Sequence, residues 1–353
     1  MDKGVIIVNG KMKAIVKTKN EKGAEVKEVS IPDYGPEQIL IKVESTSICG
    51  TDLHIYEWNN WAQKNISVPQ IMGHEVAGKV MEVGDRVENI EKGDFISAET
   101  HIPCGHCYQC KTGKQHICNN MKILGVHKDG VFAEYAVIDE VDVWKNDPSI
   151  PAEYASLQEP MGNAIDTILA GDVAGKNVLI TGAGPAGLIS VSVAKAFGAT
   201  QIIVSEPNDY RRNLALEMGA DKVVNPLEED LAGIVYELTE GIGVDFVAEM
   251  SGNEHALNES LKLITAGGKM GLLGLPDDEV SLDLTNDVIF KGIDLIGVTG
   301  REMFNTWYTA SRLLKEERID LDPVITHTFS LEEFEKGMEL METGNCGKII
   351  LKP

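Results

Sequence analysis

Short apolar runs that partly alternate with polar residues mark the opening third of the chain. They cover residues 12–17, 26–31 and 38–43, with Gly, Pro and Asp between them, and a later run covers 132–137. A period of two is typical of half-buried antiparallel strands. The pattern predicts a small β-barrel, and the residues before Met12 are either an added edge strand or a start upstream of the native one.

Strand-like and helix-like stretches alternate between residues 171 and 299. Asp209 and Gly219 bound one of the helical stretches, as an N-cap and a stop signal do. Strands separated by helices build parallel sheets with helices on both faces. The pattern predicts an α/β fold with a doubly wound, six-stranded parallel sheet, whose strands are expected at 178–181, 202–206, 222–224, 244–249, 269–273 and 294–298.

The end of the chain has helical stretches at 307–315 and 331–341 and a strand-like stretch at 348–351. We expect this tail to return to the β-rich part. A chain of 353 residues also exceeds one ordinary domain of about 150 residues. The predicted division is a catalytic domain of residues 1–160 and 303–353, and a nucleotide-binding domain of residues 161–302.

A glycine-rich turn follows the first strand of the predicted parallel sheet. Gly182, Gly184 and Gly187 fit the pattern G-x-G-x-x-G, in which a tight turn places a helix N-terminus against a pyrophosphate. Glu206 ends the next strand, where a carboxylate binds ribose hydroxyls and repels a 2′-phosphate. Three nearby cations favour NADP instead, because positive side chains can bind that phosphate. They are Arg211, Arg212 and Lys195. We give Glu206 the greater weight and predict NAD as the cofactor.

Composition narrows the class of protein. Apolar residues make up 43% of the chain, and no apolar run approaches the length of a membrane span. The first ten residues hold an apolar run of only four, which predicts no secretory leader and a cytoplasmic location. A net charge of -23 repels nucleic acid and anionic membranes, so we expect neither as a partner.

Four of the six cysteines lie within fifteen residues. Their spacing, C-x2-C-x2-C-x7-C, suits four thiolates around one tetrahedral zinc ion, and a closed coordination sphere indicates a structural metal. The sequence therefore predicts a structural zinc lobe at residues 101–120, with ligands Cys104, Cys107, Cys110 and Cys118.

A second metal site is predicted from Cys49, His74 and Glu75, a thiolate, an imidazole and a carboxylate that zinc accepts readily. A catalytic zinc with two thiolate ligands would need another cysteine. The one left over is Cys346 in the C-terminal tail, which we interpret as an ordinary free thiol. The remaining protein ligand is then an oxygen of Glu75 or of Glu159.

These motifs together resemble the zinc-dependent medium-chain dehydrogenases over nearly the whole chain. The resemblance rests on Gly73-His74-Glu75 with Gly78, the cysteine lobe and the glycine turn. It implies a GroES-like catalytic domain beside a Rossmann domain. Matches to the branch of the family that acts on L-threonine are 49–56 with Trp58 and Trp61, 101–107, 159–164, 288–292 and 300–307. Asp166, where such enzymes often have histidine, departs from the pattern.

The resemblance implies that the enzyme oxidises L-threonine at C3 to 2-amino-3-oxobutanoate, a step of threonine degradation, and passes the hydride to NAD. Thr51 would take the hydroxyl proton and His54 would pass it on through the nicotinamide ribose. Glu159 would act beside the catalytic zinc. His101 and Arg301 are candidate substrate contacts, although they can equally brace the lobe and pair with an acid.

The same resemblance implies one catalytic and one structural zinc per subunit, and a homotetramer. The residues expected to bind NAD are Gly182, Gly184, Pro185, Ala186, Gly187, Leu188, Glu206, Arg211, Leu273, Gly274, Leu275, Val298 and Thr299.

Three other functions fit part of the pattern. A related dehydrogenase for sorbitol or 2,3-butanediol would share the zinc, the cofactor and the fold. A non-catalytic NAD or metal sensor would need neither Thr51 nor His54, and both are present. A zinc-ribbon interaction protein would explain the cysteine lobe but not the nucleotide-binding fold.

Overall fold

The computed structural model describes residue 6 and residues 8–353, which form two compact units. The first comprises residues up to 159 with 327–344 and 348–353, and the second comprises 160–326 with 345–347. The sequence placed 303–326 in the first domain, whereas this division places them in the second unit. One reason is that Arg301, just before this segment, lies against Gly162. Most of the predicted N-terminal edge strand falls outside the described residues, apart from a bridge between Ile6 and Tyr34.

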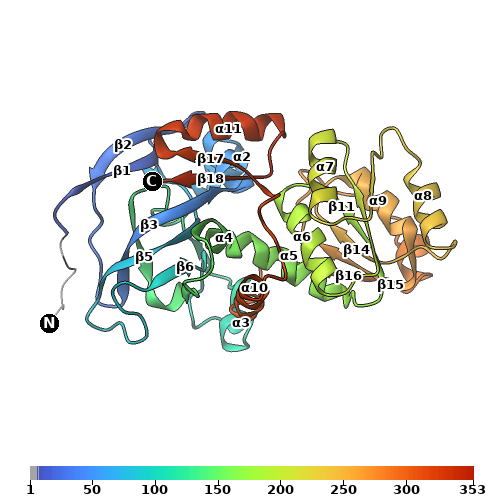
Figure 1. The fold of residues 1–353 in the computed structure, drawn as a ribbon, viewed down its shortest axis with the longest axis horizontal. Helices are drawn as coiled ribbons and strands as arrows, with labels where there is room; N and C mark the ends of the chain where they lie inside the picture. The colour runs from blue at the N-terminus through green and yellow to red at the C-terminus, as the bar shows by residue number, and fades with distance from the viewer. Residues whose placement is uncertain (1–5, 7) are drawn as a thin grey trace. The chain divides into compact units, whose positions relative to one another are not determined.

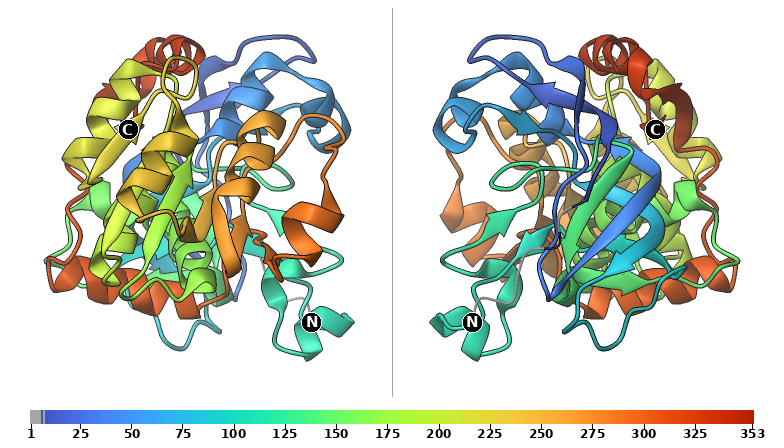
Figure 2. Two further views of the ribbon diagram at one scale, coloured as in Figure 1. Left: turned by 90° about the vertical axis from the view of Figure 1, so that its right-hand side faces the viewer. Right: turned by 90° about the vertical axis from the view of Figure 1, so that its left-hand side faces the viewer.

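The first unit is built around a bent, mostly antiparallel sheet (Figure 1 and the right panel of Figure 2). Seven strands form it, and their order is β10-β6-β5-β3-β18-β17, with β9 also paired to β3. A smaller sheet has the order β2-β1-β4. The bounds are β1 Lys11–Lys17, β2 Glu25–Ser30, β3 Gln38–Ile48, β4 Gln70–Ile71, β5 Glu75–Val83, β6 Phe95–Ala98, β9 Tyr135–Asp139, β10 Val143–Lys145, β17 Ile325–Ser330 and β18 Lys348–Lys352.

Period-two burial explains why β3 is the centre of this sheet. Ile39, Ile41 and Val43 all enter one apolar cluster with Val76 and Val80 of β5. The predicted strand at 132–137 was placed too early, because β9 begins at Tyr135. Phe132 is instead fully buried, and its carbonyl accepts a hydrogen bond from the N–H of Ile15 at 2.8 Å.

Helices and short strands complete the first unit and carry much of its chemistry. They are α1 Gly50–Glu57, α2 Asn60–Asn65, β7 His101–Ile102, α3 Tyr108–Lys111, β8 Lys122–Ile123, α4 Ala152–Ser156 and α11 Phe334–Thr343. Helix α5, Gln158–Gly171, begins at the end of the first unit's main segment.

The second unit has a six-stranded parallel sheet with the order β13-β12-β11-β14-β15-β16 (Figure 2, left panel). The order reverses between β11 and β14, which makes this sheet doubly wound, as predicted, and ligands bind such sheets at that point. Successive residues of β11 and β12 are buried, and because neighbouring side chains point to opposite faces, the sheet is covered on both sides. The strands are β11 Asn177–Thr181, β12 Gln201–Ser205, β13 Lys222–Val224, β14 Val244–Glu249, β15 Ile264–Leu272 and β16 Asp294–Gly297.

Three of the helices of the second unit begin where a polar side chain caps them. Asn208, not Asp209, caps α7, because its side chain accepts from the N–H of Arg211. The helices are α6 Pro185–Ala196, α7 Asp209–Glu217, α8 Leu231–Leu238, α9 Glu254–Leu263 and α10 Asn305–Lys315. Among the described residues, none of the helices has the length and apolar character that crossing a membrane requires.

Candidate active site

Cys49, His74 and Glu75 converge in the first unit, although two of them are some twenty-five residues from the third in sequence. Cys49 is the N-cap residue of α1, and Glu75 begins β5. One ligand atom from each lies within 4.8 Å of the others, and His74 and Glu75 are buried. Sulfur, nitrogen and oxygen donors this close together fit a zinc ion.

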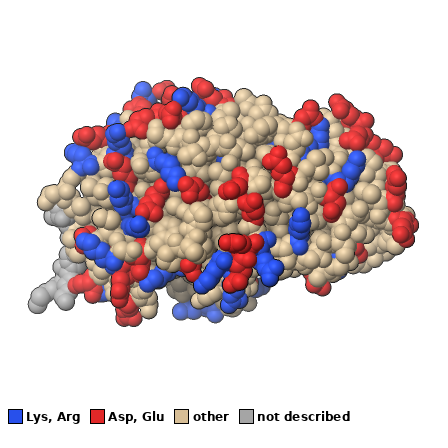
Figure 3. Space-filling view, in the orientation of Figure 1, with Lys and Arg blue, Asp and Glu red and all other residues tan. Residues whose placement is uncertain are grey.

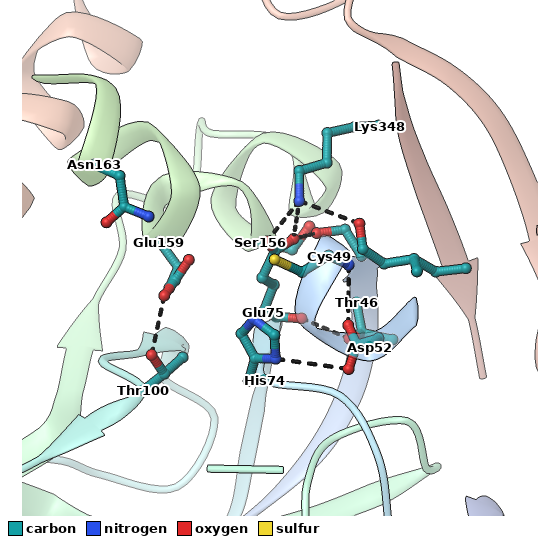
Figure 4. A network of polar contacts seen from close by, with 12 residues as sticks. Thr46, Cys49, Asp52, His74, Glu75, Thr100, Ser156, Glu159, Asn163 and Lys348 are labelled. Carbon is teal, nitrogen blue, oxygen red and sulfur yellow. Dashed lines mark hydrogen bonds and ion pairs between the residues drawn. The ribbon is translucent and has the colours of Figure 1, made fainter. Parts of the chain in front are cut away.

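Asp52 lies beside His74 and contacts both His74 and Cys49 (Figure 4). One of its carboxylate oxygens accepts from the N–H of Cys49 at 2.9 Å, and the other lies 3.7 Å from Nδ1 of His74. Burial opposes a charge on His74, but the Asp52 carboxylate and Cys49 outweigh it and raise the pKa of His74 well above its usual value. A carboxylate behind a ligating histidine fixes the ring so that its other nitrogen faces the metal. The sequence analysis missed Asp52, whose signal is an acid three residues after Cys49.

Lys348 holds the carboxylate of Glu75. The ammonium of Lys348 donates to both oxygens of Glu75 at 2.5 Å and to the carbonyl of Ile48 at 3.2 Å. The hydroxyl of Ser47 donates to the same carboxylate. Burial disfavours the charge of Lys348, but Glu75 and Cys49 overcome this and raise the pKa of Lys348. Glu75 is therefore a member of the cluster whose two oxygens are both already engaged.

Glu159 is the other acid that the sequence proposed as an oxygen ligand. It lies in the first turn of α5 with 6% of its surface exposed, and it accepts from the hydroxyl of Thr100 at 3.0 Å. Figure 4 draws it apart from Cys49 and His74. The three-residue cluster with ligand atoms within 4.8 Å contains Glu75 and not Glu159.

Helix α1 carries both residues predicted to move protons. Thr51 is half-buried in its first turn, two residues after Cys49, whereas His54 is exposed. Nδ1 of His54 lies 3.0 Å from the amide nitrogen of Asn59, a residue that the sequence analysis did not single out.

The four cysteines of the predicted lobe come together around one point. Their sulfur atoms lie within 4.8 Å of one another, with separations of 3.5 Å from Cys107 to Cys110 and 3.7 Å from Cys107 to Cys118. Four sulfurs at 2.3 Å from a tetrahedral zinc would be about 3.8 Å apart. The N–H of His106 lowers the pKa of Cys104 to about 5, which favours the thiolate that binds metal. The geometry fits the predicted structural zinc.

The glycine turn of the second unit has the predicted geometry. Gly182 has φ +85°, and a Cβ on Gly187 would lie 2.0 Å from the carbonyl oxygen of Gly182. A Cβ on Gly184 would meet nothing within 4 Å, so space is open above the turn. Because α6 has no side-chain cap at Gly184, its first N–H groups are available to an anion such as a pyrophosphate.

A pocket of about 290 Å³ lies beside this turn and is lined by Gly182, Gly184, Glu206 and Arg211. Glu206 is held in place because its carboxylate accepts from the N–H groups of Ala183 and Asn208. The sequence analysis missed other lining residues, which come from the end of β12, from later loops and from α9. These are Ser205, Pro207, Pro226, Leu227, Met250, Ser251, Asn253, His255, Ala256 and Glu259.

The other predicted cofactor residues do not line this pocket. Pro185 and Ala186 are in the first turn of α6, and Leu188 is fully buried. The ends of β15 and β16 are adjacent, because the N–H of Val298 donates to the carbonyl of Leu272. Those ends hold the remaining predicted contacts, which are Leu273, Gly274, Leu275, Val298 and Thr299.

The two candidate substrate contacts differ in exposure. His101 is half-buried and its Nδ1 lies 3.5 Å from the buried carboxylate of Glu99. Arg301 has no exposed surface, donates to Asn163 at 3.1 Å and lies over the ring of Trp307. A side chain without exposed surface cannot touch a ligand unless it moves, so in this structure Arg301 is a packing residue.

Two family profiles match the chain. One, described as the alcohol dehydrogenase GroES-like domain, matches residues 35–151, and the other, described as zinc-binding dehydrogenase, matches residues 185–316. A zinc-binding dehydrogenase from Sinorhizobium meliloti, solved with NADP, is similar with a TM-score of 0.91 and 29% identity over 98% of this chain and 100% of its own. The chain belongs to the zinc-binding dehydrogenase family.

Within this family, similar curated relatives are L-threonine 3-dehydrogenases. That of Pyrococcus furiosus is 57% identical over 96% of this chain and 98% of its own length, and that of Bacillus subtilis is 48% identical over 98% and 99%. A solved 2R,3R-butanediol dehydrogenase from Bacillus subtilis has a TM-score of 0.89 at 28% identity, over 97% of this chain and 99% of its own.

Proposed function

We propose that this protein is an NAD-dependent L-threonine 3-dehydrogenase, which oxidises the C3 hydroxyl of L-threonine to the ketone of 2-amino-3-oxobutanoate. The observation that carries the proposal is 57% identity to the Pyrococcus furiosus enzyme over nearly the full length of both chains. The cluster of Cys49, His74 and Glu75 supports it, because oxidation of an unactivated alcohol needs a group that acidifies the hydroxyl.

Cys49, His74 and a carboxylate would hold the catalytic zinc. Its contribution there would be to lower the pKa of a hydroxyl in contact with it. Asp52 keeps the ligands oriented, and Lys348 neutralises Glu75 so that the cluster does not gather uncompensated negative charge. Glu159 is the second carboxylate available to the metal or to Thr51.

Thr51 and His54 supply the path for the proton. Thr51 lies in the first turn of α1, two residues after Cys49, so the helix keeps it near the ligand cluster. His54 is exposed on the same helix and can exchange a proton with solvent. The hydride leaves from C3 to the nicotinamide ring of the cofactor.

We infer a preference for NAD over NADP from Glu206. Its carboxylate is in the pocket beside the phosphate turn and is fixed by two backbone N–H groups. A fixed negative charge at this position repels a 2′-phosphate. Arg211 lines the same pocket and would contact the adenosine ribose.

The test is NADH formation by zinc-loaded protein with L-threonine, D-threonine, sorbitol and 2,3-butanediol, each with NAD and with NADP. We expect turnover of L-threonine with NAD and little with the other pairs. Preferred turnover of a polyol would contradict L-threonine as the substrate but would not contradict the proposed role of zinc. Equal rates with NADP would contradict the role of Glu206.

We further propose a cytoplasmic homotetramer. Six free cysteines, four of them arranged as thiolate ligands, suit a reducing compartment. Acidic side chains, interspersed with basic ones, are spread over the face drawn in Figure 3, and the net charge of -23 disfavours nucleic acid as a partner. Self-association is supported by exposed apolar side chains before the edge strand β16, namely Leu284, Ile289 and Phe290.

A further inference from the structure

Glu249 is a fully buried acid at the carboxyl end of β14, one of the two strands between which the order of the parallel sheet reverses. Its direct neighbour across the sheet is Thr181, the last residue of β11. Gly182, the first glycine of the phosphate-binding turn, follows Thr181 in the chain. Glu249 thus lies at the edge where doubly wound sheets bind ligands, although it is not among the residues that line the pocket beside the turn.

The carboxylate of Glu249 accepts hydrogen bonds from two strand ends. Its Oε1 accepts from the N–H of Ser251 at 2.9 Å, from the N–H of Gly252 at 3.0 Å and from the hydroxyl of Thr181 at 3.3 Å. The hydroxyl of Ser251 donates to the same oxygen. Burial of a carboxylate is costly unless its oxygens are hydrogen-bonded, so the turn after β14 is held in the shape that supplies these donors.

Ser251 connects Glu249 to the helix that follows. The hydroxyl oxygen of Ser251 accepts from the N–H of Asn253 at 3.0 Å, and its own proton is then directed to Glu249. Asn253 is the N-cap of α9, because its side chain accepts from the N–H of Ala256 at 3.1 Å. A chain of hydrogen bonds therefore runs from the carboxylate of Glu249 to the start of α9.

This segment forms part of the wall of the pocket beside the phosphate turn. Its lining residues are Met250, Ser251, Asn253, His255, Ala256 and Glu259. The turn lies directly against it, since a Cβ on Gly182 would be 3.0 Å from Cα of Ser251. Glu206, which also lines the pocket, accepts from the N–H of Ala183 in the same turn. Two carboxylates therefore fix this region, and only Glu206 lines the pocket itself.

We propose that Glu249 is a positioning residue for the cofactor. It holds residues 250–253 and the start of α9 against the phosphate turn, and so shapes the part of the pocket that receives the adenosine and phosphate groups. The proposal rests on the NAD binding proposed above and deepens it. Because these residues are ordered before the cofactor arrives, NAD does not bear the cost of ordering them.

Two replacements separate the shape of Glu249 from its charge. Glu249→Gln keeps the length of the side chain and an oxygen that can accept from the same donors. Glu249→Asp keeps the charge but is one methylene shorter, so its oxygens fall short of Ser251 and Gly252. We expect the affinity for cofactor to fall by about ten-fold in Glu249→Asp and by less than about three-fold in Glu249→Gln. The reverse order would show that charge, not position, is what Glu249 contributes.

The first test is calorimetric binding of NADH and of ADP-ribose to the zinc-loaded natural protein and to both variants. ADP-ribose lacks the nicotinamide ring, so it reports on the adenosine and phosphate part of the pocket alone. We expect Glu249→Asp to weaken both ligands by the same factor. Natural affinity for ADP-ribose in Glu249→Asp would overturn the proposal, and a natural protein that binds neither ligand would contradict NAD dependence as well.

The second test is steady-state kinetics with L-threonine. We expect Glu249→Asp to raise KM for NAD, with kcat and KM for L-threonine unchanged, because the replacement alters only how the cofactor is held. An equal fall of kcat would indicate a general loss of structure and contradict a positioning role. A natural protein that binds NADH but does not oxidise L-threonine would refute the proposed substrate, and the binding test would still decide the role of Glu249.

Asp245→Ala is the matched control. Asp245 is near the other end of β14, and its carboxylate accepts from the N–H of Asn177 of β11 at 2.8 Å. We expect this variant to lower the melting temperature and leave the affinity for ADP-ribose unchanged. If it weakened ADP-ribose as much as Glu249→Asp does, any contact between the two strands would suffice, and Glu249 would have no particular role.

Thr181→Val is a milder second variant, which decides the question if Glu249→Asp does not fold. It keeps the volume of the side chain and removes one of the donors to Glu249. We expect the affinity for ADP-ribose to fall by about two- to three-fold, with the melting temperature nearly unchanged. Unchanged affinity in Thr181→Val would in that case rule the proposal out.

Discussion

At the scale of single residues, charged side chains buried in the first unit have distinct roles. Lys348 and Glu75 neutralise one another beside the metal cluster, and Lys17 is satisfied by three backbone carbonyls. Asp142 differs, because one oxygen of its carboxylate is buried without a hydrogen-bond partner. Such groups cost free energy unless they are neutral or paired.

Asp142 should make the protein less stable as the pH rises. Burial, helped by Asp139 and Glu99, raises the pKa of Asp142 to about 8. A raised folded-state pKa means that the folded protein binds the proton more tightly, so stability falls between about pH 4 and pH 8. We expect Asp142→Asn to raise the melting temperature by several degrees at pH 9 and hardly at all at pH 4. An equal gain at both pH values would contradict this.

Removal of Lys348 should be far more damaging than removal of an exposed lysine. Lys348→Met would leave the Glu75 carboxylate buried without its cation, at a cost of about 3–5 kcal/mol. Thermal unfolding and zinc content are the measurements, and the double variant Lys348→Met with Glu75→Gln should recover part of the loss.

The control for Lys348 is Lys79→Met. Lys79 pairs with Glu44 at 3.4 Å on the surface, where such pairs are worth about 0–1 kcal/mol. Comparable losses of thermal stability in the two lysine variants would show that the buried pair does not stabilise the protein more than a surface pair does.

At the scale of elements, the cysteine lobe has little structure of its own. Helix α3 has four residues, and β7 and β8 have two each. Elements this short bury too little apolar surface to hold their shape alone, so metal ligation must supply the free energy.

Loss of zinc should therefore unfold the lobe without unfolding the rest of the first unit. We expect Cys110→Ser to bind one zinc fewer per subunit and to lose hydrogen-exchange protection over about residues 101–123. Protection in β3 and β5 should be unchanged, because their apolar cluster does not depend on the lobe. Retained protection in a lobe without metal would contradict the structural role of the zinc.

At the scale of the whole molecule, the parallel sheet ends in an edge strand, β16, with an apolar segment before it. Phe290 is 77% exposed and Ile289 is 68% exposed, so two large apolar side chains lie next to one another at the surface. An uncovered edge strand invites pairing with another chain. Both observations favour this face as an interface between subunits.

Replacement of Phe290 by Asp should weaken the assembly. We expect light scattering to show a smaller species than the natural protein forms at the same concentration, because a charge would have to be buried in the interface. Tyr108→Asp is the control, since Tyr108 is 76% exposed on α3 of the lobe. A tetramer that persists in Phe290→Asp, or a natural protein that is a monomer, would contradict this assignment.

The sequence by itself determined those elements and motifs that are formed by residues close together along the chain. The alternation of strand-like and helix-like stretches predicted the sheet of the second unit, and that sheet is confirmed with the reversal of order at β11. The spacing of four cysteines and of three glycines predicted their geometry, because a short segment has few ways to bring such residues to one point. The ends of helices and strands were predicted less accurately. The strand β9 begins later than predicted, and the cap of α7 is Asn208.

Only the tertiary structure decided which distant groups meet. Lys348 and Glu75 are 273 residues apart, and they meet because β18 pairs with β3, which also pairs with β5. Nothing near Lys348 in the sequence indicates this. The side-chain oxygen of Asn59 likewise accepts from the N–H of Trp61 only because α2 begins there. Pairing of strands and orientation of side chains depend on the topology of the whole unit, which local patterns do not specify.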